Sequence, residues 1–338
     1  MNFDFTDDQQ AIKRTAKDFL ASRYKAEKVR ELAESGTYDD GLWGEISELG
    51  WPGIYIPEEY GGQGLGVVEL VIVMEELGYA LAPSPFFSNA AAGLAILHGG
   101  SEDQKQRWLP GIASGEQRGT VAVVSGGEAP LVPDADSASV IVLIDGDTAA
   151  LVEAGDAEIE ERAVIDSTRR FSSVRAEGGD TLGGDFSAGI DRAEAALSAE
   201  LVGVGQRVME MAVEYAKDRK QFDRPIGSYQ AVSHRCAEML LWVESARSAA
   251  YYAGWASDFE PESAAIAASV AKAYAADAGW KVTASALQVH GGIGFTWEHD
   301  LHFFLKRART DGHLFGSASK HRERVAELSG LSRAPAPA

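Results

Sequence analysis

The organisation of this chain is decided by the stretch Arg219-Lys220-Gln221-Phe222-Asp223-Arg224-Pro225-Ile226-Gly227-Ser228-Tyr229-Gln230, which lies between two long helical patterns. A second stretch, Gln288-Val289-His290-Gly291-Gly292-Ile293-Gly294-Phe295, complements its chemistry. Together they offer a fixed cation, an aromatic ring, side-chain amides and a glycine turn with open backbone N–H groups. Guanidinium groups form strong charge-assisted bonds with phosphate, and glycine lets backbone donors approach an anion closely. The two stretches therefore predict a site for the phosphates of a dinucleotide.

Both stretches also fit a purely structural interpretation. Arg219 and Lys220 would suit the cationic end of a helix, which the helix dipole favours. The pair Gly291-Gly292 would suit a helix C-cap. His290 is expected to be a packed or capping residue rather than a ligand or a base. Seven histidines and one cysteine predict no metal site.

The composition is that of an ordinary soluble globular protein. Of the 338 residues, 45% are hydrophobic and 24% are charged, and the net charge is −20. This acidity argues against nucleic acid or an anionic membrane as a partner. No apolar run approaches the roughly 20 residues of a membrane helix, and the N-terminus shows no signal pattern. Because a single cysteine fits a reducing compartment, we expect a cytoplasmic protein.

Residues 1–118 are predicted to form a helical domain. Thr6 is a candidate N-cap, because apolar residues follow it at helical spacing. Prolyl and glycyl residues at 57–64 interrupt the pattern. Further helical segments are predicted at 42–49, 67–82 and 101–111.

Residues 119–187 are predicted to form a small β domain. Short apolar runs rich in valine and isoleucine occur here between glycine, aspartate and proline residues, as is typical of strands. The predicted strands lie at 120–124, 140–144, 148–152 and 171–174.

Residues 188–330 are predicted to form a helical bundle. Apolar residues recur there at spacings of three and four, which indicates long amphipathic helices. Ser228 is predicted to cap the second helix and Pro261 to open the third. The four helices are predicted at 195–217, 228–256, 261–289 and 300–309. An Ala-Pro repeat predicts a flexible tail at 331–338.

In this order of domains, and in several short motifs, the chain resembles the flavin-dependent acyl-CoA dehydrogenases. The N-terminal motifs are Phe5-Thr6-Asp7-Asp8-Gln9, Leu49-Gly50-Trp51, Pro57-Glu58-Glu59-Tyr60-Gly61-Gly62-Gln63-Gly64 and Glu75-Glu76-Leu77-Gly78. The C-terminal motifs are the two stretches quoted above. Their joint order covers nearly the whole chain. The resemblance implies a mainly α fold with an N-terminal helical domain, a middle β domain and a C-terminal four-helix bundle.

The resemblance also implies FAD as the cofactor. In that family a tetramer is built as a pair of dimers, and each FAD lies across a subunit interface. The β domain of one subunit holds the flavin ring, and the bundle of its neighbour holds the diphosphate and adenosine. Arg219 would pair with the diphosphate, and Phe222 would pack on the cofactor. The full set of implied contacts is Arg219, Phe222, Tyr229, Gln230, Gln288, Val289, Gly291 and Gly292.

The family's catalytic base is missing from its usual positions. Acyl-CoA dehydrogenases use a glutamate to remove the α-proton of the thioester while a hydride moves from the β-carbon to the flavin. Counting without gaps from Gly291-Gly292 places Phe315 at the common position of that glutamate. Counting back from Arg219 places Ala193 at the alternative position, next to Glu194. We therefore assign no catalytic residue to this chain.

The β domain also departs from the family pattern. In most members a hydroxyl-rich loop and a tryptophan-containing strand touch the flavin ring. Here Glu128 and Pro130 are the remnants of that loop, and no tryptophan occurs between Trp108 and Trp242. The segment ahead of Val140 is also short. The sequence therefore predicts a reduced β domain that lacks the strands that hold a flavin ring.

These departures predict a subunit that carries only part of an active site. Some bacterial members of the family, acting on steroid side-chain CoA thioesters, are heterotetramers in which one subunit type carries the base and the flavin-ring contacts. The chain resembles the other subunit type. We therefore expect an α2β2 complex with a homologous partner and a role in fatty acid or steroid β-oxidation. Its substrate would be an acyl-CoA with a bulky, steroid-type acyl group, and its acceptor electron-transfer flavoprotein or a similar protein.

Two other interpretations stay open. A self-sufficient homotetramer would need Glu194, which a one-residue register shift restores, or Glu200 on the same helix as its base. Both glutamates also fit a structural role as acids near a helix N-terminus. The remaining interpretation is a flavin-free scaffold or binding protein that keeps only the fold.

Overall fold

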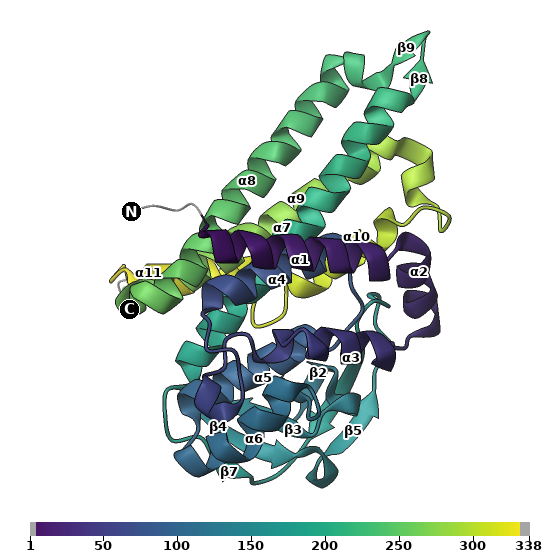
Figure 1. Cartoon of the computed structure of the whole chain (residues 1–338). Helices are drawn as coiled ribbons and strands as arrows, with labels where there is room; N and C mark the ends of the chain where they lie inside the picture. Colours follow the sequence, from purple (N-terminus) through teal and green to yellow (C-terminus); the bar gives the residue numbers. More distant parts are fainter. Residues whose placement is uncertain (1–4, 332–338) are drawn as a thin grey trace.

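The computed structural model describes residues 5–331 of the chain. They form a helical N-terminal part, a middle part with two small β-sheets and a C-terminal part of long helices (Figure 1). The mainly α fold class with a small β domain is therefore confirmed. Of the predicted tail at 331–338, only Leu331 lies within the described residues. No helix within the described range is long and apolar enough to cross a bilayer.

The N-terminal part is built from helices that pack around one apolar core. Thr6 caps the first helix as predicted, because its hydroxyl accepts from the Gln9 N–H while the Gln9 side chain accepts from the Thr6 N–H. The sequence patterns do not resolve α2 or α5. Since α5 is buried on nearly all sides, its sequence carries no amphipathic period. The helices are α1 (Asp7–Arg23), α2 (Ala26–Ser35), α3 (Asp40–Glu48), α4 (Val67–Ala80), α5 (Phe86–Gly99) and α6 (Glu102–Ser114).

The middle part contains two sheets. One has the strand order β1-β3-β4-β7, with β1 parallel to β3 and the other pairs antiparallel. The other is antiparallel, with the order β2-β6-β5. The strands are β1 (Gly119–Val123), β2 (Ala129–Pro133), β3 (Val140–Asp145), β4 (Thr148–Glu153), β5 (Glu158–Glu161), β6 (Phe171–Arg175) and β7 (Asp180–Thr181).

The four predicted strands correspond to β1, β3, β4 and β6 and are confirmed. The sequence patterns do not predict β2, β5 and β7, which complete the two sheets. These three strands escape sequence patterns for physical reasons. Strand β2 contains two prolines, β5 consists mostly of exposed glutamates, and β7 is two residues long.

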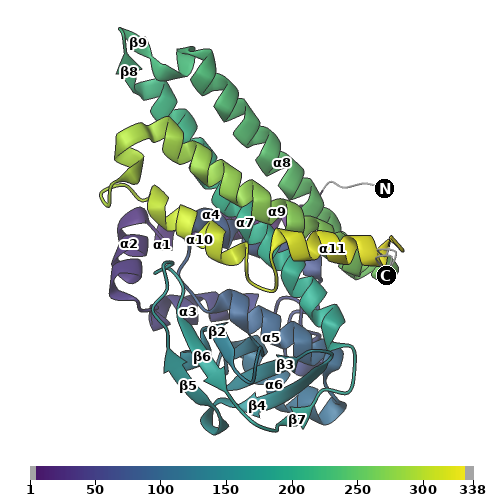
Figure 2. The same ribbon diagram turned by 180° about the vertical axis from the view of Figure 1, so that it is seen from behind.

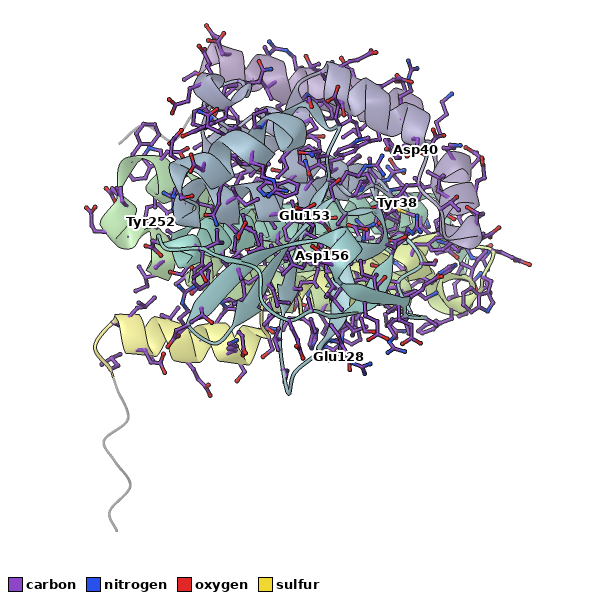
Figure 3. All side chains as sticks on the ribbon, turned by 90° about the horizontal axis from the view of Figure 1, so that it is seen from below. Tyr38, Asp40, Glu128, Glu153, Asp156 and Tyr252 are labelled. Carbon is purple, nitrogen blue, oxygen red and sulfur yellow. The ribbon has the colours of Figure 1, made fainter. Side chains whose placement is uncertain are left out.

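Buried polar side chains join the helical N-terminal part to the sheets. The Asn89 side chain, on α5, accepts from the Gly119 N–H at the start of β1 at 3.0 Å. The Tyr38 hydroxyl donates to Asp134 at 2.5 Å and accepts from the Arg170 N–H at 3.2 Å. Figure 3 views this end of the molecule and shows Tyr38 beside the sheets, with Glu128 at a hairpin on their edge. The sheets are therefore fixed to the helices by specific bonds as well as by packing.

The C-terminal part consists of three long helices and two shorter ones. Helices α7, α8 and α9 pack along one another, while α10 and α11 pack on α9 and lie between the long helices and the sheets (Figure 2). Helix α11 is absent from the sequence predictions. The bounds are α7 (Phe186–Asp218), α8 (Gln230–Phe259), α9 (Pro261–His290), α10 (Leu301–Asp311) and α11 (Ala318–Leu328).

Two predicted helix starts are wrong. Helix α7 begins at Phe186, behind the Asp185 N-cap, nine residues before the predicted start at Ala195. Its first turns are buried against α5, where Gly189 meets the α5 backbone so closely that a Cβ would lie 2.4 Å from the Leu94 carbonyl oxygen. Helix α8 is capped by Tyr229 rather than by Ser228, whose hydroxyl donates to the Pro225 carbonyl instead.

A buried ionic cluster ties the sheets to the bundle. Arg169, in the segment before β6, binds Glu200 on α7 at 2.5 Å and Asp311 on α10 at 2.9 Å. Arg307 on α10 binds Glu200 at 2.5 Å and Asp166 at 3.3 Å. Each of these five side chains is at most 4% exposed. Because buried charges are tolerated only when paired, this cluster fixes the position of the segment before β6 on the bundle.

The cluster predicts a large loss of stability when one arginine is removed. Arg307→Ala leaves Glu200 and Asp166 with fewer partners in a dry site, which we expect to lower the unfolding free energy by about 3–5 kcal/mol. Arg322→Ala removes an arginine whose ion pair with Asp277 is about half exposed, and we expect a loss below about 1 kcal/mol. Urea unfolding followed by circular dichroism measures both. Equal losses in the two variants would contradict the role assigned to the cluster.

Candidate functional site

The first predicted stretch forms a hairpin at the end of α7. Arg219 is the C-cap of that helix, and β8 (Lys220–Gln221) pairs with β9 (Arg224–Pro225). The turn residues Phe222 and Asp223 have φ angles of 52° and 62°. Two successive residues in the left-handed region are typical of a two-residue hairpin turn whose twist matches its strands. The turn holds the Phe222 ring out from the protein, where it is 88% exposed.

The residues that follow the hairpin brace it. Tyr229 caps α8, and its hydroxyl donates to the Gln221 carbonyl at 3.2 Å. The Arg224 guanidinium lies 3.9 Å from the centre of the Tyr229 ring. Gln230 is the first residue of α8, and its side chain is exposed. Tyr229 therefore has a structural task in the hairpin, while Gln230 is available to a ligand.

The second predicted stretch ends α9. Gln288 is exposed, whereas the Val289 side chain is buried, which leaves only the backbone of Val289 for a ligand. His290 is packed as expected, and its Nδ1 lies 2.8 Å from the Ala286 carbonyl oxygen. Gly291 is the C-cap, with a φ of 65° and a ψ of −138°. A Cβ at Gly291 or Gly292 would meet nothing within 4 Å, so a ligand has open access to this backbone.

Both stretches lie at the same end of the bundle. The Tyr215 ring, near the end of α7, stacks on the His290 ring at the end of α9 with centroids 4.5 Å apart. Figures 1 and 2 show β8, β9 and the end of α9 at the end of the long helices remote from the sheets. Arg219 has no carboxylate within salt-bridge distance among the described residues. The structure thus brings a free cation, an exposed ring, amides and an open glycine backbone to one region.

These residues fit the diphosphate and adenosine end of FAD. A guanidinium group without an acid partner can pair with a diphosphate, and backbone N–H groups at a glycine turn can donate to its oxygens. The exposed Phe222 ring can pack on an adenine. The side-chain amides of Gln230 and Gln288 can supply further hydrogen bonds.

A large cavity lies elsewhere, between the sheets and the bundle. Its volume is about 980 Å³. Strands β1 and β2 supply one wall, and the start of α7 and the segments around α11 supply the other. Apolar side chains dominate, among them Val121, Val123, Leu131, Ile165, Phe171, Phe186, Ile190 and Leu314. None of the eight predicted cofactor residues lines this cavity.

Phe315 lines the cavity at the position where the sequence comparison expects a glutamate. Its φ is 59°, and its ring meets the Phe87 ring edge-on with centroids 5.9 Å apart. Ala193, at the alternative position, is fully buried. Neither position offers a proton acceptor to a ligand in the cavity.

Glu194 is a carboxylate in the cavity wall. Burial and the Asp191 carboxylate, against the opposing effect of Arg324, raise its pKa to about 8. Arg324 binds Asp191 closely and lies 3.4 Å from Glu194. His321 lies 3.7 Å from Glu194. The Glu194 carboxyl is therefore mostly protonated near neutral pH, with Asp191 and Arg324 as charged neighbours.

Glu200 is engaged in the buried ionic cluster and does not line the cavity, so it is not placed to act as a base. Sequence reasoning missed Lys320, His321 and Arg324, which line the cavity from α11. The sequence feature that could have predicted α11 is the Ser317 N-cap, which is followed by a basic helical segment.

Comparison with known families gives two matches. The model of the acyl-CoA dehydrogenase N-terminal domain matches residues 6–116. The model of the acyl-CoA dehydrogenase C-terminal domain matches residues 186–329. The two matched regions together cover well over half of the chain and flank the two sheets.

Individual relatives match over nearly the whole chain. Acyl-CoA dehydrogenase IpdE2 of Mycolicibacterium smegmatis is 33% identical over 322 residues, which cover 95% of this chain and 98% of the relative. Acyl-CoA dehydrogenase IpdE2 of Mycobacterium tuberculosis is 34% identical and covers 92% of this chain and 94% of the relative.

Solved structures also match. The ChsE4-ChsE5 complex from Mycobacterium tuberculosis has a TM-score of 0.89 at 27% identity, covering 99% of this chain and 100% of that chain. The Tcur3481-Tcur3483 steroid ACAD G363A variant has a TM-score of 0.87 at 26% identity, covering 96% of this chain and 98% of that chain.

The buried position of Glu194 predicts that the stability of the folded protein depends on pH. Its pKa of about 8 in the folded protein lies above the ordinary value of 4.5, so its contribution to stability is complete below pH 4.5 and is lost as the pH rises toward 8. Glu194→Gln removes that titration. We therefore expect the stability of the wild type relative to Glu194→Gln to fall between about pH 5 and 8, by on the order of 1 kcal/mol per pH unit. Urea unfolding across this range measures it.

A matched control is Glu177→Gln, which changes an exposed glutamate in the loop before β7. Its stability should follow that of the wild type at every pH. Parallel pH profiles for the wild type and Glu194→Gln would show that the Glu194 carboxyl titrates normally.

Proposed function

The chain belongs to the acyl-CoA dehydrogenase family of FAD-dependent oxidoreductases, and we propose that it serves as one subunit of a heteromeric enzyme. In this proposal its bundle holds the diphosphate and adenosine of an FAD whose ring lies in a homologous partner subunit. The complex would remove hydrogen from the α- and β-carbons of an acyl-CoA thioester.

The observation that carries the proposal is the distance between the two sites. Glu194 lines the cavity from the start of α7, and Arg219 ends the same helix. Twenty-five residues of helix correspond to roughly 37 Å at about 1.5 Å per residue. The residues that fit a diphosphate therefore lie far from the chain's own cavity and suit a cofactor that another subunit presents.

The cavity chemistry supports the same division of labour. FAD supplies the hydride acceptor of the family's reaction, and a carboxylate general base must remove the α-proton. Phe315 has no basic group, and the Glu194 carboxyl is mostly protonated near neutral pH. The base would therefore come from the partner subunit.

The matching structures suggest the kind of complex. One of them is the ChsE4-ChsE5 complex, and another is the Tcur3481-Tcur3483 steroid ACAD variant. By analogy we propose an α2β2 assembly that acts on a bulky, steroid-type acyl-CoA and passes electrons to electron-transfer flavoprotein or a similar acceptor.

Arg219 provides the direct test. Arg219→Ala in the co-purified complex removes the charge-assisted bonds to the diphosphate, and we expect the affinity for FAD to fall about tenfold or more. The flavin that stays bound to each complex after gel filtration, measured by its absorbance, reports the loss. Lys217→Ala removes an exposed charge two residues away and should leave the flavin content unchanged. Unchanged flavin in Arg219→Ala would favour a flavin-free scaffold.

A homotetramer with Glu194 as its base is the second candidate, because Glu194 lines the cavity. Expression of the chain without a partner separates the two candidates. Our proposal predicts a preparation that does not reduce an acceptor dye when an acyl-CoA is added. A yellow homotetramer that does so, and whose Glu194→Gln variant loses the activity, would establish the homomeric enzyme instead.

A further inference from the structure

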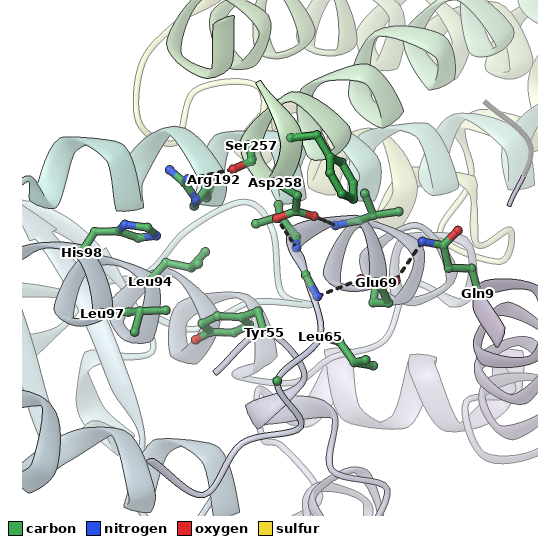
Figure 4. A pocket seen from close by; sticks show the side chains of 15 residues that line it. Gln9, Tyr55, Leu65, Glu69, Leu94, Leu97, His98, Arg192, Ser257 and Asp258 are labelled. Atoms are coloured by element: carbon green, nitrogen blue, oxygen red, sulfur yellow. Dashed lines mark hydrogen bonds between the residues drawn. The ribbon is translucent and has the colours of Figure 1, made fainter. Parts of the chain in front are cut away.

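A second pocket lies on the opposite side of the start of α7. Helices α4, α5, α7 and α8 meet there, and the volume of the pocket is about 460 Å³ (Figure 4). It shares no lining residue with the large cavity. Its polar residues include Gln9, Glu69, His98, Arg192 and Asp258. In Figure 4 His98 and Arg192 lie on one side of the pocket, away from Gln9 and Glu69.

Arg192 is a half-buried cation that no carboxylate neutralises at close range. Its guanidinium donates to the Ala188 carbonyl at 2.9 Å and to the Ser257 carbonyl at 2.8 Å. No acid lies within salt-bridge distance of it among the residues that the structure describes. Two of its five N–H donors are occupied by these bonds, which leaves donors for a ligand.

The acids of the pocket already have partners. The two oxygens of Asp258 accept from the Val67 and Val68 N–H groups at 3.0 and 3.1 Å, where they cap the N-terminus of α4. Glu69 accepts from the Gly66 N–H at 2.9 Å and from the Gln9 amide at 2.8 Å. Arg192 is thus the charged group of this pocket that keeps free hydrogen-bond donors.

His98 adds a second polar group beside Arg192. Its ring makes no hydrogen bond to any described residue, although it is partly buried. Burial, together with the nearby Arg192 cation, lowers its pKa to about 4. Near neutral pH the ring is therefore neutral, with one N–H donor available to an acceptor.

The rest of the wall is apolar. Leu94 and Leu97 come from α5, Leu65 from the loop before α4, and Phe259 from the end of α8. Leu65 is 45% exposed and Phe259 is 65% exposed. Uncovered side chains of this size next to an unpaired cation suit a ligand with an anionic head and an apolar tail.

We propose that this pocket binds a small amphipathic anion. A carboxylate or phosphate head would pair with Arg192 and accept from His98, and an alkyl tail would lie against Leu65, Leu97 and Phe259. The site lies apart from the large cavity and from the hairpin that carries Arg219, and its occupancy does not depend on which subunit carries the catalytic base.

Calorimetric titration of the full chain, in the complex in which it purifies, tests the proposal. The probes are octanoate, octyl phosphate and octanol, which share a tail and differ in the head. We expect saturable binding of at least one anion and binding of octanol at least about tenfold weaker, because octanol lacks the charge-assisted bonds. The tighter of the two anions identifies the head group.

Two variants locate the bound anion. Arg192→Gln removes the cation, and Leu65→Asp places a negative charge at an exposed position in the same pocket. Each should weaken binding about tenfold or more. Leu131→Asp is the matched control, since Leu131 is 55% exposed and lines the large cavity instead. It should leave the affinity unchanged.

Three results would overturn the proposal. The first is that neither anion binds, and the second is that octanol binds as tightly as the anions. The third is that Leu131→Asp weakens binding while Leu65→Asp does not, which would place the ligand in the large cavity.

Discussion

The length and rigidity of α7 are the constraint on which the rest of the structure depends. This helix of 33 residues begins in the wall of the large cavity and ends at the hairpin that carries Arg219. A continuous helix cannot bring its two ends together. A single cofactor therefore cannot reach from the cavity to the hairpin of the same chain. A diphosphate at the hairpin must belong to a different molecule from a ligand in that cavity. This geometry supports the proposed division of one cofactor between two chains.

Close backbone contacts and the ionic cluster hold the other elements on α7. A Cβ at Gly78 on α4 would lie 2.1 Å from the Glu200 carbonyl oxygen, and one at Gly203 on α7 would lie 1.9 Å from the Glu75 carbonyl oxygen. Glycine at both positions lets α4 and α7 touch backbone to backbone. Next to this contact, the Glu200 side chain joins Arg169 and Arg307. Helix α4, helix α10 and the segment before β6 are thus held on one helix.

The sequence was most informative where local chemistry decides the structure. The Thr6 capping box, Pro261 at the start of α9 and the glycine that ends α9 follow from local hydrogen bonds and backbone freedom. Long-range burial decides the rest. Helix α5 has no amphipathic period because it is covered on nearly all sides, and α7 starts early because its first turns pack on α5. The sequence also does not predict that α11 lines the cavity, because Arg324 binds Asp191, which lies 133 residues earlier in the chain.

The central claim is that this chain completes a flavin site whose ring belongs to its partner. An experimental structure of the co-purified complex with FAD tests it most directly. We predict that the diphosphate lies within hydrogen-bond distance of Arg219 while the flavin ring occupies the partner's cavity. A flavin ring in this chain's own cavity, between Leu131 and Phe315, would contradict the claim.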